Sequence, residues 1–360
     1  MGRSRTAIAL AGLTAAAGLI VTGMPIASAD PIGDARAQAA ALAHSIQELQ
    51  TRAEIATERF DKVNTSLQQA VGEQIHADQA LDAIQAKAAT ARQEVVDRTR
   101  ALYESGGDPV MLAAMLGGEN PLDAIDRYRL ASAVISFEAH NAEAAAHTIA
   151  AAQILDDRDA NITSRITKLQ IARNRETQRI SALITEQQQK LDNINGTIRR
   201  LYDITLAAQQ AQGAKDFASA VKAAGGTVGT GEGAPPNQTV ATAISWAKKQ
   251  LGKPYQWGGT GPASYDCSGL TQGAYDAAGV TLPRVAADQF NAGPHPSLAD
   301  LEPGDLLFWA TDVSNPATIH HVTMYLGGGL MIAAPHTGTV IQIQPVYMAG
   351  FAGATRPWAS

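Results

Sequence analysis

Apolar residues recur in alternating steps of four and three over residues 34–100, and this spacing is the strongest constraint on the fold. The series includes Leu42, Ile46, Leu49, Ala53 and Ala56, and it resumes after residue 74 with similar steps. Sustained over many heptads, such spacing predicts a coiled coil rather than the surface helix of a globular domain. Frequent alanine on the seam predicts helices that approach closely but bury little apolar area per residue.

The pattern breaks twice, at the Gly- and Pro-containing stretches 105–109 and 117–121, and a second helical pattern follows over residues 122–206. Between the breaks lies a short apolar piece, residues 110–116. We expect it to form a helical cap at the tip of a hairpin, either folded back on the coil or exposed as a docking surface for a partner. An antiparallel hairpin and a parallel homodimer both fit the two long helical patterns.

The first residues have the pattern of a secretory signal peptide. Arg3 and Arg5 precede an uncharged apolar stretch, residues 7–21, and residues 27–29 (Ala-Ser-Ala) match a cleavage site. We therefore predict a signal peptide over residues 1–29 and a mature chain that begins at Asp30. This predicts a secreted protein in a periplasm-like space or the cell wall; a retained membrane anchor is the alternative.

Composition divides the rest of the chain into a helical coiled-coil domain (30–206), a linker rich in Gly and Pro (207–238) and a compact domain (239–360). The formal charge is −6 and no basic block stands out, so we expect no nucleic-acid partner. In the last domain, helical patterns come first and short strand patterns follow. This order predicts an α+β domain with a small antiparallel sheet.

Cys267 is the only cysteine of the 360 residues, so it is an inert buried thiol, a site of intermolecular pairing or a nucleophile. It is predicted to open a helix that ends near Ala278, where the positive helix end favours the thiolate and free amides can bind an oxyanion. His320 and His321 begin an apolar run further on. A thiol and a distant histidine are the minimum parts of a cysteine-nucleophile enzyme.

A metal site is the alternative interpretation of the adjacent histidines. Neighbours on a strand point to opposite faces, however, and the chain has no CxxC or HExxH motif. We therefore expect neither a metal nor another cofactor.

Five segments occur in order in the last domain: PYQWGG, DCSGL, LPR followed by Gln289, LEPGDLLFW and HHVTMYLGGG. In this they resemble the NlpC-type bacterial cell-wall cysteine peptidases, which have a papain-like fold. The preceding helical region is similar in architecture to that of actinobacterial RipC-type endopeptidases and PcsB-type division hydrolases.

The resemblance implies an exported peptidoglycan endopeptidase that hydrolyses stem-peptide amide bonds, typically between D-glutamate and meso-diaminopimelate, in cell-wall remodelling or cell separation. By motif match, Cys267 is the nucleophile and His321 the general base and later acid. Tyr255 matches a tyrosine near the oxyanion site, and Asp266 and Ser268 match positions that hold the stem peptide. Related architectures suggest the membrane division complex FtsEX as a partner of the coiled coil, which is expected to cover the cleft until a partner engages it.

One position departs from the family pattern. The polar third residue that usually follows the histidine strand is replaced here by Ala333, and His336 is a candidate substitute. Alanine offers no acceptor to orient the imidazole. A non-catalytic cell-wall binding or scaffold protein with a decayed site, and an acyltransferase or amidase that uses the same thiol, are therefore the alternatives to a peptidase.

Overall fold

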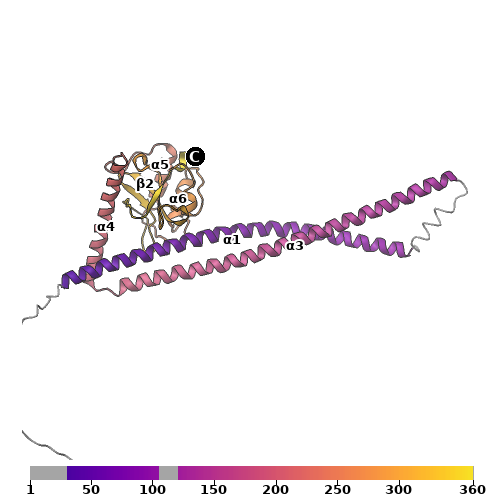
Figure 1. The fold of residues 1–360 in the computed structure, drawn as a ribbon, viewed down its shortest axis with the longest axis horizontal. Helices are drawn as coiled ribbons and strands as arrows, with labels where there is room; N and C mark the ends of the chain where they lie inside the picture. Colours follow the sequence, from indigo (N-terminus) through magenta and orange to yellow (C-terminus); the bar gives the residue numbers. More distant parts are fainter. Residues whose placement is uncertain (1–30, 105–120, 360) are drawn as a thin grey trace, which may run out of the picture.

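A computed structural model describes residues 31–104 and 121–359 of the chain (Figure 1). The predicted signal peptide and the predicted cap within residues 105–120 lie outside the described residues. Over the part that is described, no helix combines the length and the apolar character needed to cross a membrane.

Two long helices, α1 (Pro31–Glu104) and α3 (Pro121–Asp192), pack along each other. Leu49 of α1 shares a buried cluster with Ile180 of α3, and further along α1 Glu73 pairs with Arg165. Residue numbers rise along α1 as they fall along α3, so the pair is an antiparallel hairpin. Of the two arrangements compatible with the sequence, the hairpin within one chain is confirmed.

Alanine occupies much of the hairpin seam, as the spacing predicted. The buried alanines of α1 are Ala39, Ala43, Ala56, Ala70 and Ala88. Their small side chains allow a close approach of the helix axes, and each buries little apolar area.

A third long helix, α4 (Gly196–Ala223), joins the hairpin to the C-terminal domain (Figure 1). The side-chain oxygen of Asn195 caps its start by accepting hydrogen bonds of 3.0 Å from the amides of Thr197 and Ile198. The composition predicts a linker from residue 207 onward, but residues 207–223 lie in helix α4. Only residues 224–237 separate α4 from the next helix.

Burial explains why α4 continues so far. Its first half places Tyr202 in a cluster with Ala43 and Ile46 of α1, and its second half buries Phe217 and Val221 in the core of the C-terminal domain. Both halves of α4 therefore have an apolar face with a partner.

The glycines of residues 224–237 bring this stretch close to the β2–β3 turn. The amide of Gly233 donates to the carbonyl of Leu326 at 2.8 Å. A Cβ on Gly328, which has a φ of +57°, would lie 1.8 Å from the carbonyl oxygen of Gly231. Glycine is thus needed at Gly328 both for its left-handed backbone and for the contact between two backbones.

The C-terminal domain is α+β, as predicted. Its helices are α5 (Gln238–Lys248), α6 (Cys267–Asp276) and α7 (Ala286–Gln289), with 3-10 turns at Leu298–Asp300, Pro316–Thr318 and Pro357–Ala359. Its strands are β1 (Leu306–Ala310), β2 (Ile319–Gly327), β3 (Leu330–Ala333), β4 (Gln342–Pro345) and β5 (Phe351–Thr355). They form one antiparallel sheet in the order β4-β3-β2-β1-β5.

Different helices pack on the two faces of the sheet. Leu306 and Phe308 of β1 belong to the core shared with α5 and α6, whereas Leu307 and Trp309 belong to the core shared with Phe217 of α4. This alternation follows from the period of two along a strand. The sheet is therefore enclosed between the α5–α6 pair and α4.

Candidate active site

Cys267 is the first residue of α6, and Asp266 caps that helix. Asp266 has extended backbone, and its Oδ1 accepts a hydrogen bond of 2.7 Å from the amide of Gly269. The thiol receives a hydrogen bond from the backbone amide of Val322 on β2. The start of α6 thus holds the sulfur against the strand that carries His321.

The thiol of Cys267 is buried and surrounded by acidic groups. Burial raises its pKa well above the ordinary value, and the charges of Glu58, Asp266 and Glu54 raise it further. The prediction that the helix end would favour the thiolate is therefore wrong for this arrangement. The dipole of one short helix does not offset burial together with three nearby carboxyl groups.

His321 lies on β2 opposite Trp309 of β1 and is only 2% exposed. Burial lowers the pKa of its imidazole to about 4, although the charge of Glu54 acts in the opposite direction. Within the described residues, its Nδ1 is buried and has no hydrogen-bond partner. The ring is consequently neutral near pH 7 and able to accept a proton.

His320 points away from His321, as expected for neighbours on a strand. Its Nδ1 lies 2.9 Å from Oε2 of Glu54, a residue of α1. Over residues 31–104 and 121–359, no group of three or more His, Cys, Asp or Glu side chains is arranged to hold a metal ion.

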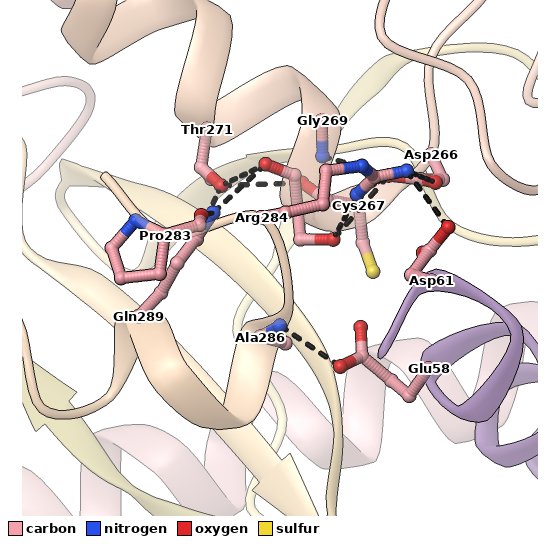
Figure 2. A network of polar contacts seen from close by, with 11 residues as sticks. Glu58, Asp61, Asp266, Cys267, Gly269, Thr271, Pro283, Arg284, Ala286 and Gln289 are labelled. Carbon is pink, nitrogen blue, oxygen red and sulfur yellow. Dashed lines mark hydrogen bonds and ion pairs between the residues drawn. The ribbon is translucent and has the colours of Figure 1, made fainter. Parts of the chain in front are cut away.

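Asp266 and Ser268, the predicted substrate-positioning residues, converge on the guanidinium of Arg284 (Figure 2). The Nη1 group of Arg284 donates to Oδ1 of Asp266 at 3.1 Å and to Oγ of Ser268 at 2.8 Å. In the sequence, Arg284 stands out only as the last residue of the LPR segment. Nothing in the sequence around Arg284 indicates that its guanidinium binds the residues on both sides of Cys267.

Gln289 fixes the loop that carries Arg284 to the start of α6. This fully buried side chain donates to the carbonyls of Ser268 and Pro283, at 2.9 Å each, and accepts from the hydroxyl of Thr271 at 2.7 Å. Figure 2 shows these bonds beside Cys267.

Tyr255 is brought to the same place. It is 7% exposed, and burial raises the pKa of its hydroxyl well above the ordinary value, followed by the charge of Cys267. The hydroxyl forms a hydrogen bond with the side chain of Thr57 on α1. Tyr255 and Cys267 share one buried cluster, and the role of Tyr255 near an oxyanion site stays a prediction.

Ala333 ends β3 and is fully buried. Because Met331 of β3 pairs with Tyr325 of β2, Ala333 shares a sheet face with His321. His336, the predicted substitute, has its Nδ1 3.0 Å from the carbonyl of Thr337 and 3.5 Å from Nε2 of Gln50. Neither of these contacts of Nδ1 is with His321, whose own Nδ1 has no hydrogen-bond partner among the described residues.

One face of α1 covers the site. Glu54, Thr57, Glu58 and Asp61 have the spacing i, i+3, i+4, i+7, which places them on one side of the helix. Oε2 of Glu58 accepts a 2.9 Å hydrogen bond from the amide of Ala286, as drawn in Figure 2.

Two further contacts hold α1 beside this site. The Oδ1 atom of Asp61 accepts a hydrogen bond of 3.0 Å from Nη2 of Arg284. The ring of Phe60 packs edge-to-face on Trp257, with 4.8 Å between the centroids. The loop before α7 and the loop before α6 are both in contact with α1.

Residues 252–356 match the NlpC/P60 family. The last third of this chain is an NlpC/P60 domain. Over 93 residues, or 26% of the chain and 31% of the relative, it is 46% identical to a γ-D-glutamyl-L-lysine dipeptidyl-peptidase of Bacillus subtilis. Over 126 residues, or 31% of the chain and 50% of the relative, it is 38% identical to the peptidoglycan endopeptidase RipB of Mycobacterium tuberculosis.

A solved structure of RipB from Mycobacterium tuberculosis is 32% identical, with a TM-score of 0.31, and the match covers 42% of this chain and 84% of that one. The chain spans between about a third and a half of the length of the curated relatives named above.

Buried acidic side chains lie where α1 packs on the NlpC/P60 domain. Burial raises the pKa of Glu58 well above its ordinary value, and the charges of Asp61 and Asp266 add to this. Burial likewise raises the pKa of Asp61 to about 8. Oε1 of Glu58 and Oδ2 of Asp61 are buried without a hydrogen-bond partner in the described part of the chain.

Glu54 behaves differently from the other two acids. Burial would raise its pKa, but the charges of His321 and His320 and the bond to His320 lower it below the ordinary value. The pKa of Glu54 is thus shifted downward, whereas the pKa values of Glu58 and Asp61 are shifted upward.

Sequence reasoning placed no site residue on residues 30–206, and the α1 face is the part of the site that it missed. Charged residues between the seam positions of a coiled coil also occur on surfaces that face solvent. Only the packing of the NlpC/P60 domain on α1 distinguishes Glu58 and Asp61 from such residues.

Proposed function

We propose that this chain is a peptidoglycan endopeptidase in which Cys267 is the nucleophile and His321 the general base. The observation that carries the proposal is the position of the thiol, at the start of α6 and bonded to the amide of Val322, the residue after His321. The thiol thus lies against the strand that carries His321, inside an NlpC/P60 domain whose relatives are named as a dipeptidyl-peptidase and a peptidoglycan endopeptidase.

The reaction follows from these groups. His321 takes the thiol proton, and the sulfur of Cys267 attacks the carbonyl carbon of the scissile amide. The first-turn amides of α6 and the hydroxyl of Tyr255 stabilise the resulting oxyanion. The protonated His321 then gives its proton to the leaving amine, which yields a thioester, and a water activated by the same imidazole hydrolyses it.

The proposed substrate is a stem-peptide bond between D-glutamate and a diamino acid, with meso-diaminopimelate as the expected diamino acid. The support is the activity in the name of the Bacillus subtilis relative, a γ-D-glutamyl-L-lysine dipeptidyl-peptidase. Asp266 and Ser268 would hold the stem peptide through the polar network around Arg284. Export through the leader, a role in cell separation and engagement by FtsEX belong to the same proposal.

The described arrangement corresponds to a latent form of this enzyme. Cys267, His321 and Tyr255 are each less than a tenth exposed, and α1 contacts the loops on both sides of the thiol. A stem peptide therefore reaches the sulfur only after α1 moves. This movement breaks the apolar contact between Phe60 and Trp257 and the hydrogen bond between Asp61 and Arg284.

A second candidate, a non-catalytic peptidoglycan-binding protein, is favoured by Ala333 alone. A binding protein needs the polar network but not a basic His321, and the absence of a polar third residue fits that role. The two candidates differ in whether any form of the chain cleaves a peptide bond.

Digestion of purified peptidoglycan, with products identified by mass spectrometry, tests the proposal. The full chain is compared with Glu58→Arg/Asp61→Arg, which opposes two new cations to Arg284. We expect cleavage by the double variant and loss of cleavage when Cys267→Ala or His321→Ala is added. Binding without cleavage in the double variant would establish the second candidate, and release of transfer products instead of hydrolysis products would identify an acyltransferase.

A further inference from the structure

His321 has a buried Nδ1 without a partner among the described residues and lies opposite Trp309, its register neighbour on β1. The centroids of the two rings are 5.7 Å apart and the rings are inclined by 52°. Ala333, on the same sheet face, contributes no polar side chain that could bond to the imidazole. The indole of Trp309 is therefore a surface against which the His321 ring packs.

Trp309 is itself held from three directions. Its ring lies 4.7 Å from that of Tyr347 at 32°, and 5.9 Å from that of Phe351 at 79°. Its Nε1 donates a hydrogen bond of 3.2 Å to the carbonyl of Tyr347. With 1% exposure, the indole has a partner for its one polar atom and no room for another rotamer.

The contacts continue from Tyr347 to α4. Gly213 of α4 lies so close that a Cβ there would be 2.8 Å from Cβ of Tyr347. Four residues further on, Phe217 is buried in the same cluster as Trp309. The segment of α4 that carries both residues precedes residue 252, where the match to the NlpC/P60 family begins.

We propose that α4 is a positioning element of the peptidase, acting on His321 through Tyr347 and Trp309 in place of a polar third residue. The proposal rests on the proposed function only for the role of His321. A hydrogen-bonding residue orients an imidazole by one directed bond; here the same restriction comes from packing of flat rings in a dense core. Trp309, Tyr347 and Gly213 are positioning residues, since none of them is proposed to touch the substrate.

The test uses the full chain in the opened form, Glu58→Arg/Asp61→Arg, as the parent. Trp309→Leu removes the flat ring and the indole N–H, and Trp309→Phe keeps a ring. Gly213→Val places a side chain of α4 against Tyr347. Ala211→Val is its matched control because Ala211 is exposed on the same helix. Each chain is measured for kcat, KM, thermal unfolding and the pH titration of the His321 imidazole by ¹⁵N NMR.

We expect Trp309→Leu to lower kcat by roughly a hundredfold, the usual cost of an angstrom-scale misplacement, with KM changed by less than about threefold. Gly213→Val should lower kcat by about tenfold, since it displaces Tyr347 and not the imidazole directly. Trp309→Phe and Ala211→Val should keep most of the parent rate. The His321 titration should shift in Trp309→Leu and Gly213→Val and stay in place in the control.

A folded Trp309→Leu or Gly213→Val chain with kcat within twofold of the parent would overturn the proposal. So would a loss of rate with an unchanged His321 titration, because the defect would then lie elsewhere. If Trp309→Leu fails to fold, Gly213→Val decides. Absence of cleavage by the parent would refute the proposed function, whereas the titration still tests the effect of α4 on His321.

Discussion

Asp61 and Arg284 lie 223 positions apart in the chain, yet Oδ1 of Asp61 accepts a hydrogen bond of 3.0 Å from Nη2 of Arg284. The same guanidinium binds Asp266, the residue before the candidate nucleophile. A residue of the helical hairpin is thus joined by one cation to the start of the nucleophile helix. One contact that holds α1 beside the site therefore runs through the cation that binds the cap of the nucleophile helix.

Reversal of charge at Asp61 should open the enzyme. Asp61→Arg places two guanidinium groups together in a buried location, and an uncompensated buried charge costs about 3–5 kcal/mol. We expect at least a roughly hundredfold rise in muropeptide hydrolysis by the full chain, on the basis of about 1.4 kcal/mol per tenfold change in an equilibrium. Asp82→Arg, at an exposed position of the same helix, is the control and should leave the rate unchanged.

Opening should also depend on pH. The pKa values of Glu58 and Asp61 are raised in the closed form, the latter to about 8. The closed form therefore binds more protons than the open form, and its stability falls as pH rises from about 4 toward 8. His321, whose pKa is lowered to about 4, acts in the opposite sense, but only below its ordinary value of about 6.5.

Between about pH 6.5 and 8 we therefore expect the pH dependence of closure to come from these two α1 carboxyls, which face Asp266 and Arg284. Hydrogen exchange of the segment 281–290, corrected for the intrinsic rate, should increase over this range. Glu58→Gln/Asp61→Asn, in which neither side chain ionises, should remove the dependence. Equal slopes in the two chains would contradict the prediction.

Gln289 should be important for stability as well as for the site. Gln289→Leu leaves the carbonyls of Ser268 and Pro283 and the hydroxyl of Thr271 without this partner. The Thr271 hydroxyl and the Ser268 carbonyl keep their 3.0 Å hydrogen bond to each other, whereas the Pro283 carbonyl loses its Gln289 donor. A buried polar group left unsatisfied costs about 1–3 kcal/mol, and we expect a loss of this size in the free energy of unfolding. Urea denaturation measures it, with Gln209→Leu on the exposed side of α4 as the control.

Alanine substitutions at two glycines distinguish the cost of a strained backbone conformation from the cost of a steric clash with a neighbouring backbone. Gly338 has a φ of +86° and open space within 4 Å of the position that a Cβ would take, whereas Gly328 has a φ of +57° and a contact of 1.8 Å. Gly338→Ala should cost about 1 kcal/mol of unfolding free energy, the usual cost of forcing a side chain into the left-handed region. Gly328→Ala should cost several kcal/mol in total, because residues 231 and 328 must also separate. Similar values for the two variants would show that residues 224–237 do not pack on the β2–β3 turn in solution.

Local features of the site could be predicted from the sequence because they depend on neighbours in the chain. Asp266 accepts the bond from the Gly269 amide because a capping residue and the first helical turn are adjacent. Helix α6 therefore begins at Cys267, as predicted, and ends at Asp276, two residues earlier than expected. The small antiparallel sheet and the two long helices likewise follow from periodicity and breakers, whereas the choice between an antiparallel hairpin and a parallel homodimer does not.

What the sequence by itself determined is a long helical region, an α+β domain, a thiol at a helix start and a histidine on a later strand; it did not determine that α4 continues to Ala223. The tertiary structure alone decided that Glu58 and Asp61 are buried at the site, that burial among carboxyl groups raises the pKa of Cys267, and that α4 supports the face that carries His321. The physical reason is that a charged or apolar side chain on a long helix has the same local pattern whether it faces water or another domain. Its environment is set by the packing of segments that are more than 200 residues apart.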